Sequence, residues 1–121
     1  MAAVLGIGGV FVKSRDPDAL RAWYRDMLGL EIHDWGGAQL QSTERSYSVW
    51  SAFRADTGYF APSDREFMLN LRVDDLDELL AKLRALGARV LDRREDSGDG
   101  KFGYVVDPDG TLLELWQAPA G

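Results

Sequence analysis

The sequence contains no cysteine and a single histidine among its 121 residues. Without cysteine the chain has no disulfide bond, no thiolate metal site and no cysteine nucleophile. With one histidine, His33, we find no serine–histidine–aspartate triad. We interpret His33 as a surface or strand-edge residue. These absences remove many catalytic mechanisms from consideration.

Long hydrophobic runs and an excess of positive charge are also missing. No run of about 18 or more apolar residues occurs, and the first residues lack a basic leader, so we expect no membrane span. The formal net charge is −6, which argues against binding to nucleic acid or to an anionic membrane surface. We therefore expect a cytoplasmic protein with neither kind of partner.

Hydrophobic residues make up 45% of the chain, enough for the core of one domain spanning residues 1–121. A strand followed by a helix occurs twice in it. In residues 68–87 (MLNLRVDDLDELLAKLRALG) apolar and polar residues first alternate, and leucines then recur at spacings of three and four. Residues 9–29 (GVFVKSRDPDALRAWYRDMLG) have the same plan. The pattern predicts two copies of one unit.

Capping residues place the two helices. Asp16 and Pro17 are typical of a helix start, and Gly29 is typical of a helix end. Asp75 and Gly87 bracket the second helix in the same way. Strands are predicted at about residues 7–14, 30–35, 38–42, 47–53, 67–73, 89–93, 101–106 and 111–116, with turns at 36–37, 95–100 and 107–110.

This order predicts an α+β fold of two βαβββ modules, with a mostly antiparallel sheet and helices on one side of each half. The first module covers about residues 7–53, the linker 54–66, and the second module about 67–117. The linker carries Tyr59 and Phe60, which we interpret as a lid or a subunit contact. A ferredoxin-like sandwich is the alternative fold, but its βαββαβ order lacks one strand per unit.

The repeated plan and three segments resemble the vicinal oxygen chelate superfamily, which includes glyoxalase I, extradiol dioxygenases and bleomycin-resistance proteins. The segments are RDPDALRAWYRDMLGLEI, VDDLDELLAKLRALGARV and VVDPDGTLLELWQ. The resemblance covers essentially the whole chain. It implies that the modules form a cup-like sheet with helices outside, a binding site inside the cup, and a homodimer.

The resemblance also implies where a metal would bind, and there this sequence departs from the family. The two family histidine positions fall on Gly9 and Met68, and the glutamate position falls on Glu114. The fourth ligand position of lyase members falls within residues 49–51 (VWS). A divalent ion needs three or more oxygen or nitrogen donors at about 2.0–2.6 Å. We therefore predict that the chain binds no metal and no other cofactor.

Strand alternation assigns side chains to the two faces of the sheet. The side chains predicted to face the helices are Val10, Val12, Leu69, Leu71, Val73, Leu113 and Leu115. The predicted ligand-binding residues, some of them facing the cup, are Phe11, Lys13, Trp50, Met68, Asn70, Arg72, Tyr104 and Trp116. The alternative is that Arg72 pairs with Glu114 across adjacent strands, while Phe11 and Met68 fill a closed interior.

Three functions fit these residues. The first is a metal-free protein of the bleomycin-resistance kind that sequesters a small, partly aromatic or polar molecule in its cup. The second is a lyase, isomerase or dioxygenase-type enzyme that uses Glu114 as an acid, a base or a metal ligand. The third is a structural or regulatory dimer without a ligand. The sequence leaves open whether the protein is an enzyme.

Overall fold

The computed structural model describes residues 10, 14–38, 40 and 55–119. None of the helices in these ranges is long and apolar enough to cross a bilayer. Several predictions lie wholly or mostly outside the described residues: the strands at 7–14, 38–42 and 47–53, and the site residues Gly9, Phe11, Lys13 and Trp50.

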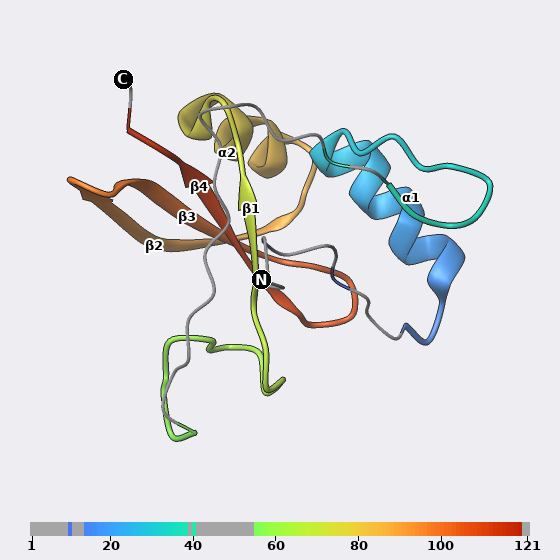
Figure 1. The fold of residues 1–121 in the computed structure, drawn as a ribbon, viewed down its shortest axis with the longest axis horizontal. Coiled ribbons are helices and arrows are strands. Elements are labelled where there is room, and N and C mark those ends of the chain that lie inside the picture. The colour runs from blue at the N-terminus through green and yellow to red at the C-terminus, as the bar shows by residue number, and fades with distance from the viewer. Residues whose placement is uncertain (1–9, 11–13, 39, 41–54, 120–121) are drawn as a thin grey trace, which may run out of the picture.

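The second half of the chain has the predicted βαβββ order (Figure 1). The elements are β1 (Leu69–Arg72), α2 (Leu76–Ala85), β2 (Arg89–Ser97), β3 (Gly100–Val106) and β4 (Leu112–Gln117). The sheet order is β1-β4-β3-β2, in which β1 and β4 are parallel and the other neighbours are antiparallel. The described fold is therefore α+β with a mixed, open, four-stranded sheet.

The first helix, α1 (Pro17–Leu28), begins and ends where its caps predict. The Asp16 side chain accepts a hydrogen bond from the backbone N–H of Ala19 at 3.1 Å, and Gly29 ends the helix with a φ of 70°. α2 begins at its predicted cap, Asp75, and its end is one residue earlier than predicted, at Leu86 instead of Gly87.

The strand predicted at 30–35 is wrong. His33 donates its backbone N–H to the carbonyl of Gly37 at 2.9 Å, and Gly36 donates to the carbonyl of His33 at 2.9 Å, which closes a tight turn. The carbonyl of Gly36 in turn accepts a bond from Arg21 Nε on α1 at 2.9 Å. Among the described residues, these bonds pair the backbone of His33 and Gly36 within a turn and with α1.

The β2–β3 hairpin is longer than predicted. Residues 95–97 were expected in a turn, but they belong to β2 and pair with residues 100–102 of β3. Only Gly98 and Asp99 connect the two strands. The acidic composition that suggested a turn instead reflects an exposed edge strand, where charged side chains are common because they discourage further pairing.

The main hydrophobic core lies between α2 and one face of the sheet, with α1 beside α2 (Figure 1). Predictions for the helix-facing side chains of β1 and β4 are confirmed, whereas Val10 is 56% exposed. A Cβ atom at Gly103 would lie 2.9 Å from Leu80 Cδ1, so this glycine lets α2 approach the sheet closely. The fully or nearly fully buried residues of this core are Leu76, Leu80, Leu83, Val105, Leu113 and Leu115.

Candidate functional site

The face of the sheet opposite α2 carries Glu114 at the centre of a row of polar side chains. Glu114 on β4 pairs with Asn70 on β1 and with Tyr104 on β3, so the three side chains lie next to one another across the strands. The next row on the same face joins Arg72, Trp116 and Phe102. The alternation predicted for β4, with Glu114 and Trp116 away from the helices, is confirmed.

Glu114 is only 7% exposed, and both of its carboxyl oxygens accept hydrogen bonds. Asn70 Nδ2 donates to Oε1 at 2.7 Å, and the Tyr104 hydroxyl donates to Oε2 at 2.9 Å. The hydroxyl of Tyr59, from the segment between the halves, also donates to Oε2. We call Asn70, Tyr59, Tyr104 and Glu114 the carboxylate cluster. Every donor in it is a neutral group, so within the described residues the cluster solvates a buried carboxylate without an ion pair.

The hydroxyl oxygens of Tyr59 and Tyr104 also lie 2.6 Å from each other. Three oxygens are therefore in mutual contact: the two hydroxyls and Oε2 of Glu114. When the carboxyl is ionised, only two hydroxyl protons are available for three contacts. One of the three contacts therefore has no proton of its own.

Both tyrosines of the cluster hold their protons more tightly than an exposed tyrosine does. Burial and the hydrogen bond to Glu114 raise the pKa of Tyr59 from 10.0 to about 12. Burial and the hydrogen bonds with Tyr59 and Glu114 raise the pKa of Tyr104 well above its ordinary range. Both hydroxyls therefore act as neutral donors across the physiological pH range.

This shift predicts a loss of stability at alkaline pH. Between pH 10 and about 12 the unfolded chain loses tyrosine protons that the folded chain keeps, so stability is full below pH 10 and falls as the pH rises. Thermal unfolding measured across this range should show the decrease in stability. The decrease should be smaller in Tyr59→Phe. In a spectrophotometric titration of the folded protein, Tyr24, Tyr59 and Tyr104 should ionise late; ionisation of all the tyrosines near pH 10 would contradict the described burial.

The row beside the cluster is aromatic and basic. Phe102 and Trp116 stack with ring centroids 6.2 Å apart and ring planes 6° from parallel. The Arg72 guanidinium lies 5.0 Å from the centre of the Trp116 ring. The indole N–H of Trp116 donates to the carbonyl of Asp99 at 2.9 Å, which holds the ring in place. We call Arg72, Phe102 and Trp116 the aromatic row; it offers flat π surfaces next to a buried carboxylate.

Arg93 on β2 covers the two tyrosines. Its guanidinium lies 3.9 Å from the centre of the Tyr104 ring and 5.0 Å from that of Tyr59, and it donates to the carbonyl of Tyr59 at 3.0 Å. The sequence interpretation did not include Arg93, because the register of β2 shifts between Val90 and Arg94 and alternation cannot be carried past the shift. Tyr59 was predicted to belong to a lid or a subunit contact, and its hydrogen bond to Glu114 was not predicted.

The structure brings most of the described candidates together. Asn70, Tyr104 and Glu114 belong to the carboxylate cluster. Arg72 and Trp116 belong to the adjacent aromatic row. Met68 is half-buried and packs against the small core around Tyr104. The alternative of an Arg72–Glu114 ion pair is wrong for the residues that the structure describes, because Glu114 accepts from neutral donors there. That these residues bind a ligand stays a prediction.

The residues at the family metal position do not fit a divalent ion. Within residues 14–38 and 55–119, no group of three or more His, Cys, Asp or Glu side chains could hold one. Met68 offers only a thioether sulfur, a soft ligand, and both oxygens of Glu114 already accept hydrogen bonds. No chemical step through a metal can be built from these donors.

Two cavities of about 480 Å³ each lie elsewhere, and Glu114 lines neither. One lies at the end of the β2–β3 hairpin, where Lys101 and Gln117 are part of its lining. The other is lined by Arg15, Asp64, Arg65, Pro108 and Asp109.

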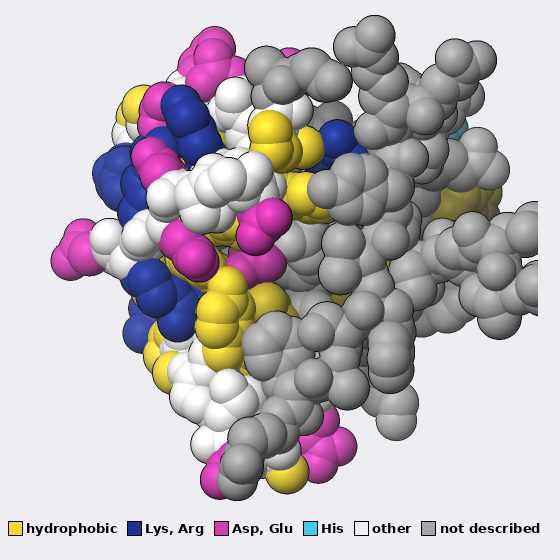
Figure 2. Space-filling view, turned by 60° about the vertical axis from the view of Figure 1, so that its left-hand side comes forward, with side chains coloured by type: hydrophobic (Ala, Val, Ile, Leu, Met, Phe, Trp, Pro, Cys, Tyr) yellow, Lys and Arg dark blue, Asp and Glu magenta, His cyan; other side chains and the backbone are white. Residues whose placement is uncertain are grey.

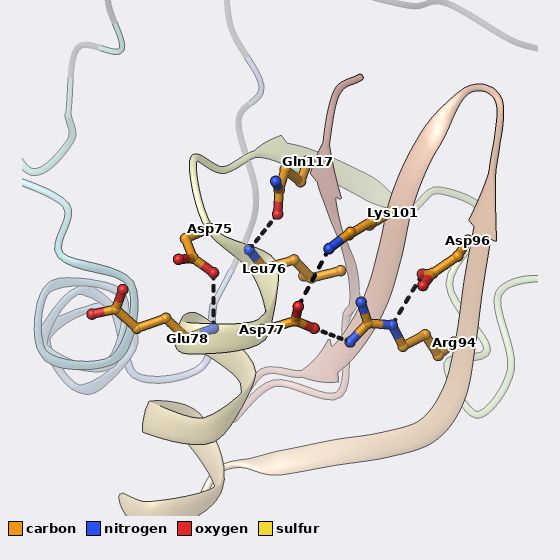
Figure 3. Close-up of polar contacts among 8 residues, drawn as sticks. All are labelled: Asp75, Leu76, Asp77, Glu78, Arg94, Asp96, Lys101 and Gln117. Carbon is orange, nitrogen blue, oxygen red and sulfur yellow. Dashed lines mark hydrogen bonds and ion pairs between the residues drawn. The ribbon is translucent and has the colours of Figure 1, made fainter. Parts of the chain in front are cut away.

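The polar residues near the hairpin cavity are already paired with one another (Figure 3). Asp77 on α2 accepts from Arg94 and from Lys101, the latter at 3.3 Å, and Arg94 also donates to Asp96 at 3.0 Å. The Gln117 side-chain oxygen accepts the backbone N–H of Leu76 at 2.8 Å. Figure 2 shows acidic and basic side chains interspersed on this side of the molecule. This region therefore joins α2 to the hairpin, and its charges neutralise one another.

A βαβββ module with parallel β1 and β4 and a buried glutamate on its last strand defines the class of the vicinal oxygen chelate proteins. The model of one family in this class, described as the glyoxalase-like domain, matches residues 9–116. The chain belongs to this family.

Individual relatives agree with this assignment. CFP32, a candidate glyoxylase of Mycobacterium bovis and Mycobacterium tuberculosis, is 27% identical over 117 residues, which cover 90% of this chain and 44% of CFP32. The chain thus spans less than half the length of these curated relatives.

Two solved structures share the fold. TnmS3, an antibiotic binding protein from Streptomyces sp. CB03234, superposes with a TM-score of 0.64 at 20% identity, covering 98% of this chain and 100% of TnmS3. TioX from Micromonospora sp. ML1 superposes with a TM-score of 0.52 at 16% identity, covering 89% of this chain and 92% of TioX.

Proposed function

We propose that this protein binds a small, planar aromatic molecule on the sheet face that carries Glu114, and holds it without a metal and without transforming it. The observation that carries the proposal is the combination of a buried carboxylate, solvated by three neutral donors, with a stacked aromatic pair in the adjacent row. Small-molecule sites typically combine apolar and aromatic surface with a few convergent polar groups.

The bonding of Glu114 favours binding over catalysis. A general base must present a free lone pair to the proton it removes. Here Oε1 accepts from Asn70, and Oε2 accepts from both tyrosines. These bonds occupy three of the roughly four lone-pair positions of the carboxylate, so little of its acceptor capacity is left for taking up a proton.

The aromatic row gives the proposed ligand its shape. Trp116 is only 6% exposed, so the half-buried Phe102, stacked near-parallel to it, presents the flat surface, and Arg72 adds a cation over the indole. Planar aromatic rings pack well against such groups. TnmS3, which shares the fold, is an antibiotic binding protein, and an aromatic natural product is a reasonable class of ligand for this chain too. A homodimer and a cytoplasmic location stay predictions from the sequence.

Titration with 2-naphthol, followed by amide and indole signals in nuclear magnetic resonance, tests the proposal. We expect saturable shifts centred on β1, β3, β4 and the Trp116 indole, and an affinity that does not change when EDTA is added. The saturated analogue decahydro-2-naphthol has the hydroxyl but no flat ring, and we expect it to bind about tenfold more weakly. Equal binding of the two compounds, or shifts centred elsewhere, would contradict the proposal.

Two adjacent arginines supply a matched control for this titration. Arg93 covers the tyrosines, whereas Arg94 pairs with Asp77 on α2. Arg93→Ala should weaken 2-naphthol binding by about two- to fivefold, the size of a partly exposed cation–π contact. Arg94→Ala, which removes the same charge one residue away, should leave the affinity unchanged.

A further inference from the structure

We propose that the Tyr59 side chain occupies the place of a ligand hydroxyl, so that the site selects uncharged phenols and a bound phenol replaces Tyr59 beside Glu114. This inference rests on the proposed function and names the class of ligand for the same site.

Tyr59 has the contacts that a bound phenol would make. Its hydroxyl donates to Glu114 and lies 2.6 Å from the Tyr104 hydroxyl. Its ring meets the Tyr104 ring edge to face, with centroids 6.0 Å apart and planes at 77°. The Arg93 guanidinium lies over the same ring, 5.0 Å from its centre. The groups around this side chain are therefore already complementary to a phenol.

Tyr59 also differs from the rest of the carboxylate cluster in its origin. Asn70, Tyr104 and Glu114 all project from strands of the sheet, whereas residues 55–66 contain turns and bends and neither helix nor strand. Near Tyr59 the contacts include the bond from Arg93 to its carbonyl and a local bond from its backbone N–H to Thr57 Oγ1 at 3.1 Å. A segment of this kind can move without breaking the sheet.

The cluster stays satisfied when Tyr59 leaves. Oε1 of Glu114 keeps Asn70 as a donor, and Oε2 keeps Tyr104. The buried carboxylate is then not left without hydrogen bonds, which would be costly. Because two hydroxyl protons serve three oxygen contacts, exchanging the Tyr59 hydroxyl for another hydroxyl keeps the number of hydrogen bonds constant.

The chemistry of Glu114 limits what can take the place of Tyr59. The incoming group must donate a hydrogen bond to a carboxylate, which an aryl ether cannot do. It must also be uncharged or cationic, because an aryl carboxylate would place a second negative charge beside a buried one. An uncharged phenolic ring meets both conditions and can keep the edge contact with Tyr104 and the cation of Arg93.

Three matched compounds test this inference: 4-ethylphenol, 4-ethylanisole and 4-ethylbenzoate, each titrated into the wild type and Tyr59→Ala. In Tyr59→Ala we expect 4-ethylphenol to bind about tenfold more tightly than in the wild type, and about tenfold more tightly than the ether or the carboxylate. Tyr59→Ala/Glu114→Gln should lose the preference for phenol over ether. Tyr24→Phe removes a tyrosine hydroxyl that donates to a different carboxylate, that of Asp107. This variant should bind all three compounds with wild-type affinity.

In the wild type, 4-ethylphenol should speed hydrogen exchange of the backbone amides of residues 55–62, whereas 4-ethylanisole should not. Tyr59→Phe keeps the ring and removes only the hydroxyl; it should bind 4-ethylphenol more tightly than the wild type, and it carries the test if Tyr59→Ala does not fold. Equal affinity for 4-ethylphenol and 4-ethylanisole in Tyr59→Ala and in Tyr59→Phe would overturn this inference. In that case 2-naphthol binding at the aromatic row would still support the proposed function. No binding of any of these aromatics at this face would overturn both.

Discussion

Replacing Asp107 by alanine is expected to lower the free energy of unfolding by about 3–5 kcal/mol, because it leaves three hydrogen-bond donors without their acceptor. Asp107 is 6% exposed and lies in the turn between β3 and β4. Its Oδ2 accepts the Tyr24 hydroxyl at 2.8 Å, and its Oδ1 accepts the backbone N–H groups of Asp109 at 2.9 Å and Thr111 at 3.0 Å. Urea denaturation of the two proteins measures the difference.

Tyr24→Phe is the matched control for the Asp107 change. It removes one donor and keeps the buried ring of α1, so we expect a loss of about 1 kcal/mol. A loss of less than about 1 kcal/mol for Asp107→Ala would mean that the turn between β3 and β4 forms without this carboxylate. It would also mean that Asp107 does not join α1 to this turn. The sequence identified this stretch as a turn, whereas the structure adds its contact with a helix 83 residues away along the chain.

Leu83→Ala is expected to cost about 2–5 kcal/mol, the range for deleting a fully buried leucine and leaving a cavity. Leu83 is 0% exposed and lies in the core between α2 and the sheet. The surrounding leucines come from rigid strands and from the same helix, so they can fill the space only in part. Thermal and urea unfolding should both show the loss.

Leu86→Ala provides the comparison within the same region of the chain. Leu86 caps α2 and is 50% exposed, so the same chemical change there should alter stability by no more than about 0.5 kcal/mol. Similar losses for the two variants would show that α2 does not pack on the sheet through Leu83. A large difference would confirm that α2 packs on the sheet through the face that carries Leu83.

The predicted elements that the structure confirms are those that depend on interactions between residues close together in the sequence. Asp16 and Asp75 cap their helices through their own side chains, within three residues along the chain. The alternation of β4 places Glu114 and Leu115 on opposite faces, because successive side chains of any strand point in opposite directions. Glu114 itself was identified as a candidate through the family resemblance; the structure gives its burial, and its role in a site stays a prediction.

The elements that failed depend on what lies next to them in space. A strand exists only where a neighbour pairs with it, and the described residues 30–35 instead include a turn that bonds His33 to Gly36 and Gly37. The hairpin of β2 and β3 continues through residues whose composition is typical of a turn, because each strand supplies the other's hydrogen bonds. Propensity cannot report a partner that is distant in sequence.

The sequence by itself determined the βαβββ order of the second half, the two helices, and the faces of β1 and β4, all of which follow from spacing over a few residues. The family resemblance places Gly9 and Met68 at metal-ligand positions, and a metal-free site stays a prediction from it. Only the tertiary structure decided that Tyr59 reaches Glu114 and that Arg93 lies over Tyr59 and Tyr104, because these contacts depend on the path of residues 55–66 and on the register shift in β2. The candidate site is therefore a strand residue recognisable from the sequence, completed by two side chains that folding alone brings to it.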